Sequence, residues 1–271
     1  MIIISPGYVL SQGDNASHPH IAYQTWVRDR VADDITVSSE TADGPKDAIL
    51  RPETAEYWQA SALPATWTID LGQARAVDYV GLAGHTIGTE LAAVKIEHSP
   101  DNSAWTQFAG ELAPVTDAPI LFLDASISRR YWRITLTGSG AVPKLAVAYM
   151  GEVLIAQRGI YGGHSPAPLS RDTELFQNMS DGGQFLGQFI RRRGVNGSAS
   201  FRNLEPDWYR TNFDPFVKAA RQFPFFFAWR PVDYPTEVAY AWTDKNIRPS
   251  NMGVRGLMEV SFNFKGIGFN E

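Results

Sequence analysis

The sequence contains no cysteine. This absence excludes disulfide bonds and thiolate metal sites, and it is typical of proteins that fold in a reducing cytoplasm. No segment approaches the ~20 apolar residues that a membrane-spanning helix needs, and the first residues lack the basic stretch of a secretory signal. The net charge is -5, so no chain-wide positive field favours nucleic acid. We therefore expect no membrane span and no nucleic-acid sequence recognition.

Signatures of common catalytic and cofactor sites are also missing. The sequence has neither a Gly-rich phosphate loop nor a nucleophile elbow. His18 and His20 form one close pair, but the other histidines are scattered and no cysteine assists them. We expect no enzyme activity, no cofactor and no metal site. A depolymerase stays open as an alternative, because two carboxylates facing each other across a cleft leave no mark in sequence spacing.

The central part of the chain shows apolar and polar residues in alternation. The clearest segments are 67–72, 94–98 and 131–136. In the first of these, Trp67, Ile69 and Leu71 alternate with polar residues, which predicts a strand with one face in a core and one in water. Short strands about ten residues apart, joined by turn clusters, are typical of a β-sandwich. We expect such a sandwich over residues 31–155.

Several motifs in this region occur in the order found in the discoidin, or coagulation-factor C-type, domain. They are Trp67-Thr68-Ile69-Asp70-Leu71-Gly72, the strand–turn–strand segment from Lys95 to Trp105, and Arg130-Tyr131-Trp132-Arg133-Ile134. Residues 31–152 therefore resemble this family, although they lack the cysteine pair that often ties its termini together. The resemblance implies a galactose-binding-like jelly roll, whose loops at one end often bind glycans, phospholipid headgroups or proteins.

The loops implied by this resemblance are where a ligand would bind. They cover about residues 40–46, 57–60 and 85–90. From them we take four residues as candidates for glycan binding: Tyr57, Trp58, His85 and Glu90. The polar content of these loops is equally that of any solvated loop, so the sequence leaves both readings open.

After about residue 156 a second pattern begins. Pro206 suits the first turn of a helix, and Asp214 and Pro215 predict a second helix start, with Asp as the cap and Pro at the first helical position. Apolar residues from Phe216 to Phe223 then recur at i, i+3, i+4 and i+7, a stripe that must pack on a sheet. Strands are predicted at 174–179 and 185–190 before the helix, and at 225–229, 237–242 and 257–265 after it. We predict a small α+β domain over residues 156–271, with one helix packed across a sheet.

The order of these elements resembles minor tail and distal tail proteins of long-tailed bacteriophages. The segments most similar to those proteins are Phe201–Leu204, Trp208–Arg210 and Pro224–Pro231. In that family such a domain forms rings that continue the tail tube. The resemblance implies a virion protein of the tail tip or baseplate, assembled in the host cytoplasm, with the discoidin-like sandwich as a peripheral arm.

Such a ring would be a hexamer or a trimer of this chain that also contacts other tail proteins. Apolar area and ion pairs with a neighbour's carboxylates favour lasting contacts. The expected interface residues are Arg191, Arg192, Arg193, Phe225, Phe227 and Trp229. The alternative function is a carbohydrate-binding module that recognises host surface glycans. Residues 1–30 form a lead-in that joins either the sandwich or the ring domain.

Overall fold

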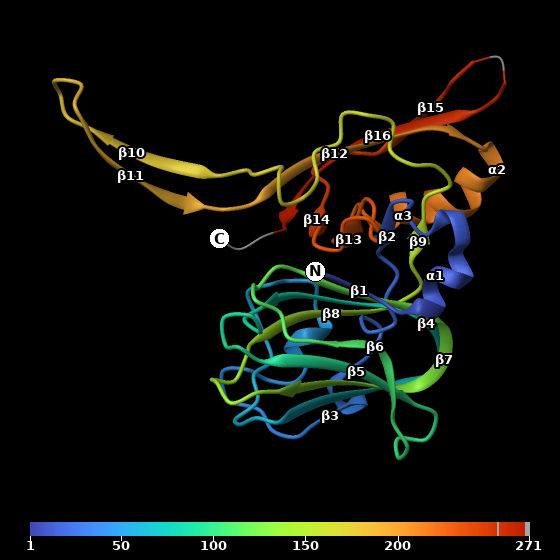
Figure 1. Cartoon of the computed structure of the whole chain (residues 1–271), viewed down its shortest axis with the longest axis vertical. Helices are drawn as coiled ribbons and strands as arrows, with labels where there is room; N and C mark the ends of the chain where they lie inside the picture. Colours follow the sequence, from blue (N-terminus) through green and yellow to red (C-terminus); the bar gives the residue numbers. More distant parts are fainter. Residues whose placement is uncertain (254, 269–271) are drawn as a thin grey trace.

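The computed structural model describes residues 1–253 and 255–268. Two β-sheet bodies are stacked on one another, and a long hairpin projects from the second (Figure 1). The strands are β1 (Ile2–Ile4), β2 (His20–Ala22), β3 (Ile35–Val37), β4 (Ala65–His85), β5 (Ala93–Ser99), β6 (Thr106–Leu112), β7 (Ile120–Thr137), β8 (Leu145–Gly151), β9 (Leu154–Ile155), β10 (Glu174–Met179), β11 (Phe185–Arg192), β12 (Val195–Leu204), β13 (Phe225–Ala228), β14 (Val238–Trp242), β15 (Arg248–Asn251) and β16 (Met258–Ile267). The α-helices are α1 (Pro6–Gln12), α2 (Pro206–Trp208) and α3 (Asp214–Ala219).

The first body is one sheet folded over on itself. Its strand order is β3-β4-β7-β5-β6, with β1 added to β7 and β8 added to β4. The pairing of β4 with β7 is interrupted between Asp70 and Arg75, where Gly72 has a φ of 77° that favours glycine. Both long strands bend at this end, so their halves lie in opposite layers of a sandwich (Figure 1).

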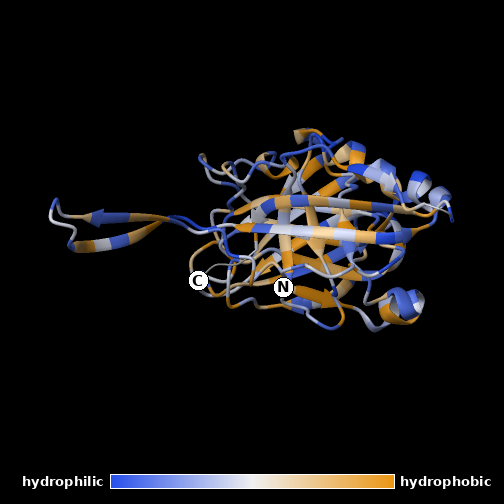
Figure 2. Cartoon of the chain, turned by 90° about the horizontal axis from the view of Figure 1, so that it is seen from above, coloured by the Kyte–Doolittle hydropathy of each residue, from blue (hydrophilic) through white to orange (hydrophobic). Residues whose placement is uncertain are grey.

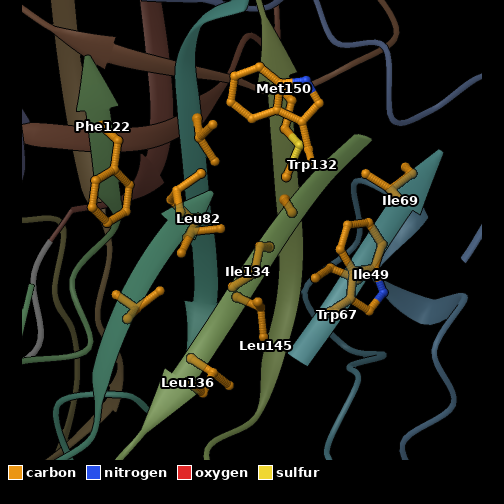
Figure 3. Packing of buried hydrophobic residues seen from close by; sticks show 14 of the residues in the cluster. Ile49, Trp67, Ile69, Leu82, Phe122, Trp132, Ile134, Leu136, Leu145 and Met150 are labelled. Atoms are coloured by element: carbon orange, nitrogen blue, oxygen red, sulfur yellow. The ribbon is translucent and has the colours of Figure 1, made fainter. Parts of the chain in front are cut away.

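The core between the two layers confirms the predicted alternation. Trp67 and Ile69 of one layer are fully buried and belong to the same cluster as Leu82 and Phe122 of the other (Figure 3). Because β4 and β7 bend at one end, their free ends meet at the other. The loops 38–64, 86–92, 113–119 and 138–144 gather there, and we call this part of the sandwich the open end.

The second body is a sheet with the order β12-β16-β14-β13-β2-β9, and β15 also pairs with β16. One face is covered by residues 206–219, where Phe213 and Phe216 pack on Phe225 and Phe262. The predicted helix is therefore present and begins at Pro206, the first of the two predicted starts. The second predicted start is wrong, because a π-helical turn, Tyr209–Phe213, joins α2 directly to α3 and Asp214 is not a cap.

The lead-in of residues 1–30 belongs to both bodies. β1 pairs in parallel with β7 of the sandwich, whereas β2 lies between β13 and β9 of the second sheet. α1 was not predicted from the sequence. Pro6 is its first residue, and the Ser5 hydroxyl accepts a hydrogen bond from the Gly7 N–H at 3.2 Å.

A third apolar cluster joins the two bodies, and we call it the junction core. Tyr79 and Tyr149 of the sandwich meet Phe226 and Tyr240 of the second sheet, and all four are almost completely buried. The contact is so close that a Cβ atom on Gly81 would lie 2.6 Å from the Phe226 ring. The two bodies therefore pack as closely against each other as layers of a single domain do.

Among residues 1–253 and 255–268, no helix is long and apolar enough to cross a membrane.

Candidate functional site

The loops at the open end are held together by hydrogen bonds. The Trp58 N–H donates to the Leu145 carbonyl at 2.9 Å and the reverse bond measures 3.0 Å. The Thr89 hydroxyl donates to Asp117 at 2.6 Å, which connects loop 86–92 to loop 113–119. The structure thus brings together the three loops that the sequence analysis singled out.

Two of the four glycan-binding candidates, Trp58 and His85, are not on the surface. Trp58 is fully buried, because its backbone pairs with Leu145 and turns the indole into the sandwich core. His85 is the last residue of β4, lies opposite Leu145 in the β4–β8 register and is only 3% exposed. These two residues support the loops and cannot contact a ligand, which corrects the sequence prediction.

His85 is held as a neutral imidazole. Its Nδ1 accepts a hydrogen bond from the Ile87 N–H at 3.4 Å, so the proton lies on Nε2, which donates to the Ala118 carbonyl at 3.1 Å. Burial lowers the pKa of His85 to about 4. Both ring nitrogens are thus used to fix the loops at the open end.

The other two candidates reach the surface. Tyr57 is half-buried, and the Lys144 ammonium lies 4.2 Å from the centroid of its ring. Glu90 is also half-buried, in the neighbouring loop, where its N–H donates to the Thr86 carbonyl at 3.0 Å. Tyr57 borders a hollow in the surface.

This hollow lies beside the loop that precedes β4 and measures about 360 Å³. Its wall contains the carboxylates of Asp43, Asp47 and Glu56, the Arg51 guanidinium and the ring of Tyr57. Arg51 and Glu56 form an exposed ion pair at 2.8 Å. The hollow therefore presents hydrogen-bond acceptors, hydrogen-bond donors and one aromatic ring, and we call it the open-end hollow.

Sequence reasoning missed most of these side chains. Asp43 belongs to a loop that was singled out, but Asp47, Arg51 and Glu56 lie between the loops at 40–46 and 57–60 and were not selected. The charged residues in this stretch, set between two strands, were the available signal. Their convergence depends on the 3-10 turn at Ala48–Leu50, which curls the loop around the hollow.

The six expected ring-interface residues do not form one surface. Phe225 and Phe227 are buried between the second sheet and its helix, so they are core residues and cannot contact a neighbour. The ring of Trp229 is stacked on Tyr234 at 5.4 Å between centroids, and its indole N–H donates to Glu237. Phe225 and Phe227 were selected for their aromatic side chains, but β13, the strand that carries them, is central in its sheet.

The three arginines lie on or beside the projecting hairpin. Arg191 is exposed and forms an ion pair with Glu174 at 3.1 Å, and Arg192 forms one with Asp172 at 3.3 Å. Arg193 directly follows β11 and is also exposed. They flank the base of the hairpin, and its apolar residues lie further out.

The hairpin formed by β10 and β11 extends away from both bodies (Figure 2). Its large apolar side chains are between 43% and 64% exposed: Leu175, Phe176, Met179, Phe185, Leu186, Phe189 and Ile190. Leu175 lies opposite Ile190, and Phe176 lies opposite Phe189. Since neighbouring residues of a strand point to opposite faces, the hairpin carries apolar side chains on both of its faces.

Comparison with protein families identifies the first body. Residues 34–147 match the model of the F5/8 type C domain, so this part of the chain forms a discoidin-like jelly roll as expected. No curated protein sequence matches the chain.

Several solved structures of carbohydrate-binding modules are similar to part of the chain. A chitosan-binding module 1 from a chitosanase/glucanase of Paenibacillus sp. IK-5 has 16% identity over 48% of this chain and 99% of its own, with a TM-score of 0.41. A CBM32 module of Clostridium perfringens in complex with GalNAc-β-1,3-galactose has 15% identity over 44% of this chain and 94% of its own, with a TM-score of 0.39. A pectin-binding carbohydrate-binding module has 13% identity over 44% of this chain and 88% of its own, with a TM-score of 0.38.

Proposed function

We propose that this protein binds carbohydrate through the open end of its discoidin-like sandwich. The observation that carries the proposal is the open-end hollow, in which the Tyr57 ring lies beside charged side chains of both signs. The F5/8 type C match supports the placement, because the resemblance implies ligand binding by loops at one end of this fold. The loops there are cross-linked by hydrogen bonds, so the site is formed before any ligand arrives.

The chemistry of the open-end hollow suits a sugar. A pyranose carries hydroxyl groups around its edge, which donate to carboxylates such as Asp43 and accept from guanidinium groups such as Arg51. Its C–H face is apolar and packs on an aromatic ring such as Tyr57. A volume of about 360 Å³ lies at the lower end of the range of small-ligand pockets. Binding of this kind needs no reaction, and we assign none to the site.

The proposal is tested by a glycan array probed with the labelled full-length chain. We expect a defined set of glycans to bind, and Tyr57→Ala to weaken the binding about tenfold, as expected for the loss of one stacked ring. Tyr161→Ala is the matched control, because Tyr161 is exposed but lies far from the open end. Equal binding by the wild type and the Tyr57 variant would refute the assignment. Release of reducing ends would instead indicate a depolymerase.

One observation favours a second function, that of an assembly subunit. A two-stranded hairpin is at best marginally stable alone in water, and β10–β11 exposes apolar side chains on both faces. Another surface must cover these faces, and copies of the same chain are the occupant that a ring would supply. The proposed ring of a phage tail tip rests on this hairpin and on the sequence resemblance. A sugar-binding arm and a ring-forming hairpin are compatible in one chain.

A further inference from the structure

The loop from Asp43 to Tyr57 borders two more hollows besides the open-end hollow. A second hollow, of about 510 Å³, shares Asp47 and Arg51 with it. A third, of about 420 Å³, shares Pro52, Glu53 and Gln222 with the second and Ala55 with the open-end hollow. The three hollows therefore adjoin one another around the same loop, and we call them together the junction groove.

The walls of the junction groove come from both bodies. In the second hollow, the Arg28 guanidinium lies 3.5 Å from the centroid of the Phe223 ring, which belongs to the second body. Beside the third hollow, the Tyr240 hydroxyl donates to the Pro52 carbonyl at 2.6 Å. These contacts fix the two walls relative to each other. The second and third hollows thus exist only because the second sheet is docked on the sandwich.

The groove has an aromatic side chain near each end. Tyr57 borders the open-end hollow, and Trp242, which is 38% exposed, borders the third hollow from β14. The charged side chains of the middle hollow are Arg28, Arg30, Arg51, Asp47 and Glu53. Because both signs are present, neither a polyanion nor a polycation is favoured, while a neutral chain rich in hydroxyl groups finds both donors and acceptors.

We infer that the junction groove binds a linear, uncharged oligosaccharide that runs from Tyr57 to Trp242 across both bodies. This inference rests on the proposed function, since the open-end hollow holds one end of the chain. The second sheet then contributes directly to recognition. Affinity must rise with oligosaccharide length until the chain reaches the ring of Trp242.

The test is calorimetry with the full-length protein and β-linked galactose, glucose and N-acetylglucosamine oligosaccharides of one, two, four and six units. We expect the longest member of the bound series to bind about tenfold more tightly than the monosaccharide, as one further stacked ring predicts. Trp242→Ala should remove this gain and leave monosaccharide binding unchanged. Gln222→Trp, at an exposed position between the second and third hollows, should block the groove and have the same effect.

The control is Tyr161→Ala, which removes an exposed ring outside the groove and should change neither affinity. Binding that depends on Tyr57 but is the same for all lengths would refute the junction groove and leave the proposed function intact. If the affinity of both Trp242→Ala and Gln222→Trp still rose with oligosaccharide length, the junction groove would be refuted as well. Absence of binding at every length would overturn the proposed function and this inference together.

Discussion

Replacing Asp78 by Asn should make the protein more stable at alkaline pH. Asp78 lies on β4 close to the contact between the bodies, and its carboxyl accepts a hydrogen bond from the Val153 N–H at 2.8 Å. Burial, together with the nearby charge of Glu152, raises the pKa of Asp78 from 3.8 to about 7. The Asn side chain has nearly the same shape, can still accept the bond from Val153 and carries no charge.

The size and sign of the effect follow from proton linkage. Between pH 3.8 and about 7 the folded protein keeps a proton on Asp78 that the unfolded chain has released, so wild-type stability falls as the pH rises through this window. The full difference in pKa corresponds to about 4 kcal/mol. Because water reaches part of the side chain, we expect Asp78→Asn to be about 2–4 kcal/mol more stable than the wild type at pH 8. The two proteins should be nearly equal near pH 4.

Urea unfolding followed by tryptophan fluorescence measures this difference at several pH values. The buried His20 and His85, each with a pKa lowered to about 4, destabilise both proteins as the pH falls below about 6.5, and this effect cancels in the comparison. Asp181→Asn, at the exposed tip of the hairpin, is the control and should show no pH-dependent difference. A stability difference for Asp78→Asn that is the same at pH 4 and pH 8 would refute the reasoning.

Two further predictions concern the hairpin and the junction core. Phe176→Asp combined with Phe189→Asp should weaken self-association at least about hundredfold, because each phenylalanine contributes about 1.5–3 kcal/mol when it is buried. Sedimentation velocity measures the self-association, and Gln188→Asp is the control. An unchanged association state of the double variant would contradict an assembly role. Gly81→Val places side-chain atoms where the Phe226 ring lies, and should lower the free energy of unfolding by about 1–3 kcal/mol in urea. Unchanged stability of this variant would mean that the bodies are not packed as described.

Local patterns predicted the sandwich well but not how the bodies combine. The alternation around Trp67 and the turns between strands depend on neighbours in sequence, and the structure confirms them. β2 pairs with β13, which follows about two hundred residues later. Such a pairing leaves no local pattern in the sequence, so the prediction left open which body the lead-in joins. The junction core, which fills the space between the bodies, could not be predicted for the same reason.

The candidate site shows the same limit. Tyr57 is half-buried and borders the open-end hollow, but the adjacent Trp58 is buried, because the bridge to Leu145 decides which side chain points inward. The exposure of the β10–β11 hairpin was equally invisible, since its sequence reads like an ordinary pair of strands. Trp242 was missed because only the docking of the second sheet brings it to the groove.

The most direct test of sugar binding at the open end is a crystal structure of the full-length protein with the oligosaccharide that binds best on the array. We predict a sugar ring packed on Tyr57, with its hydroxyl groups within hydrogen-bond distance of Asp43 and Arg51. A sugar bound only elsewhere on the protein, with the open-end hollow holding none, would contradict the account.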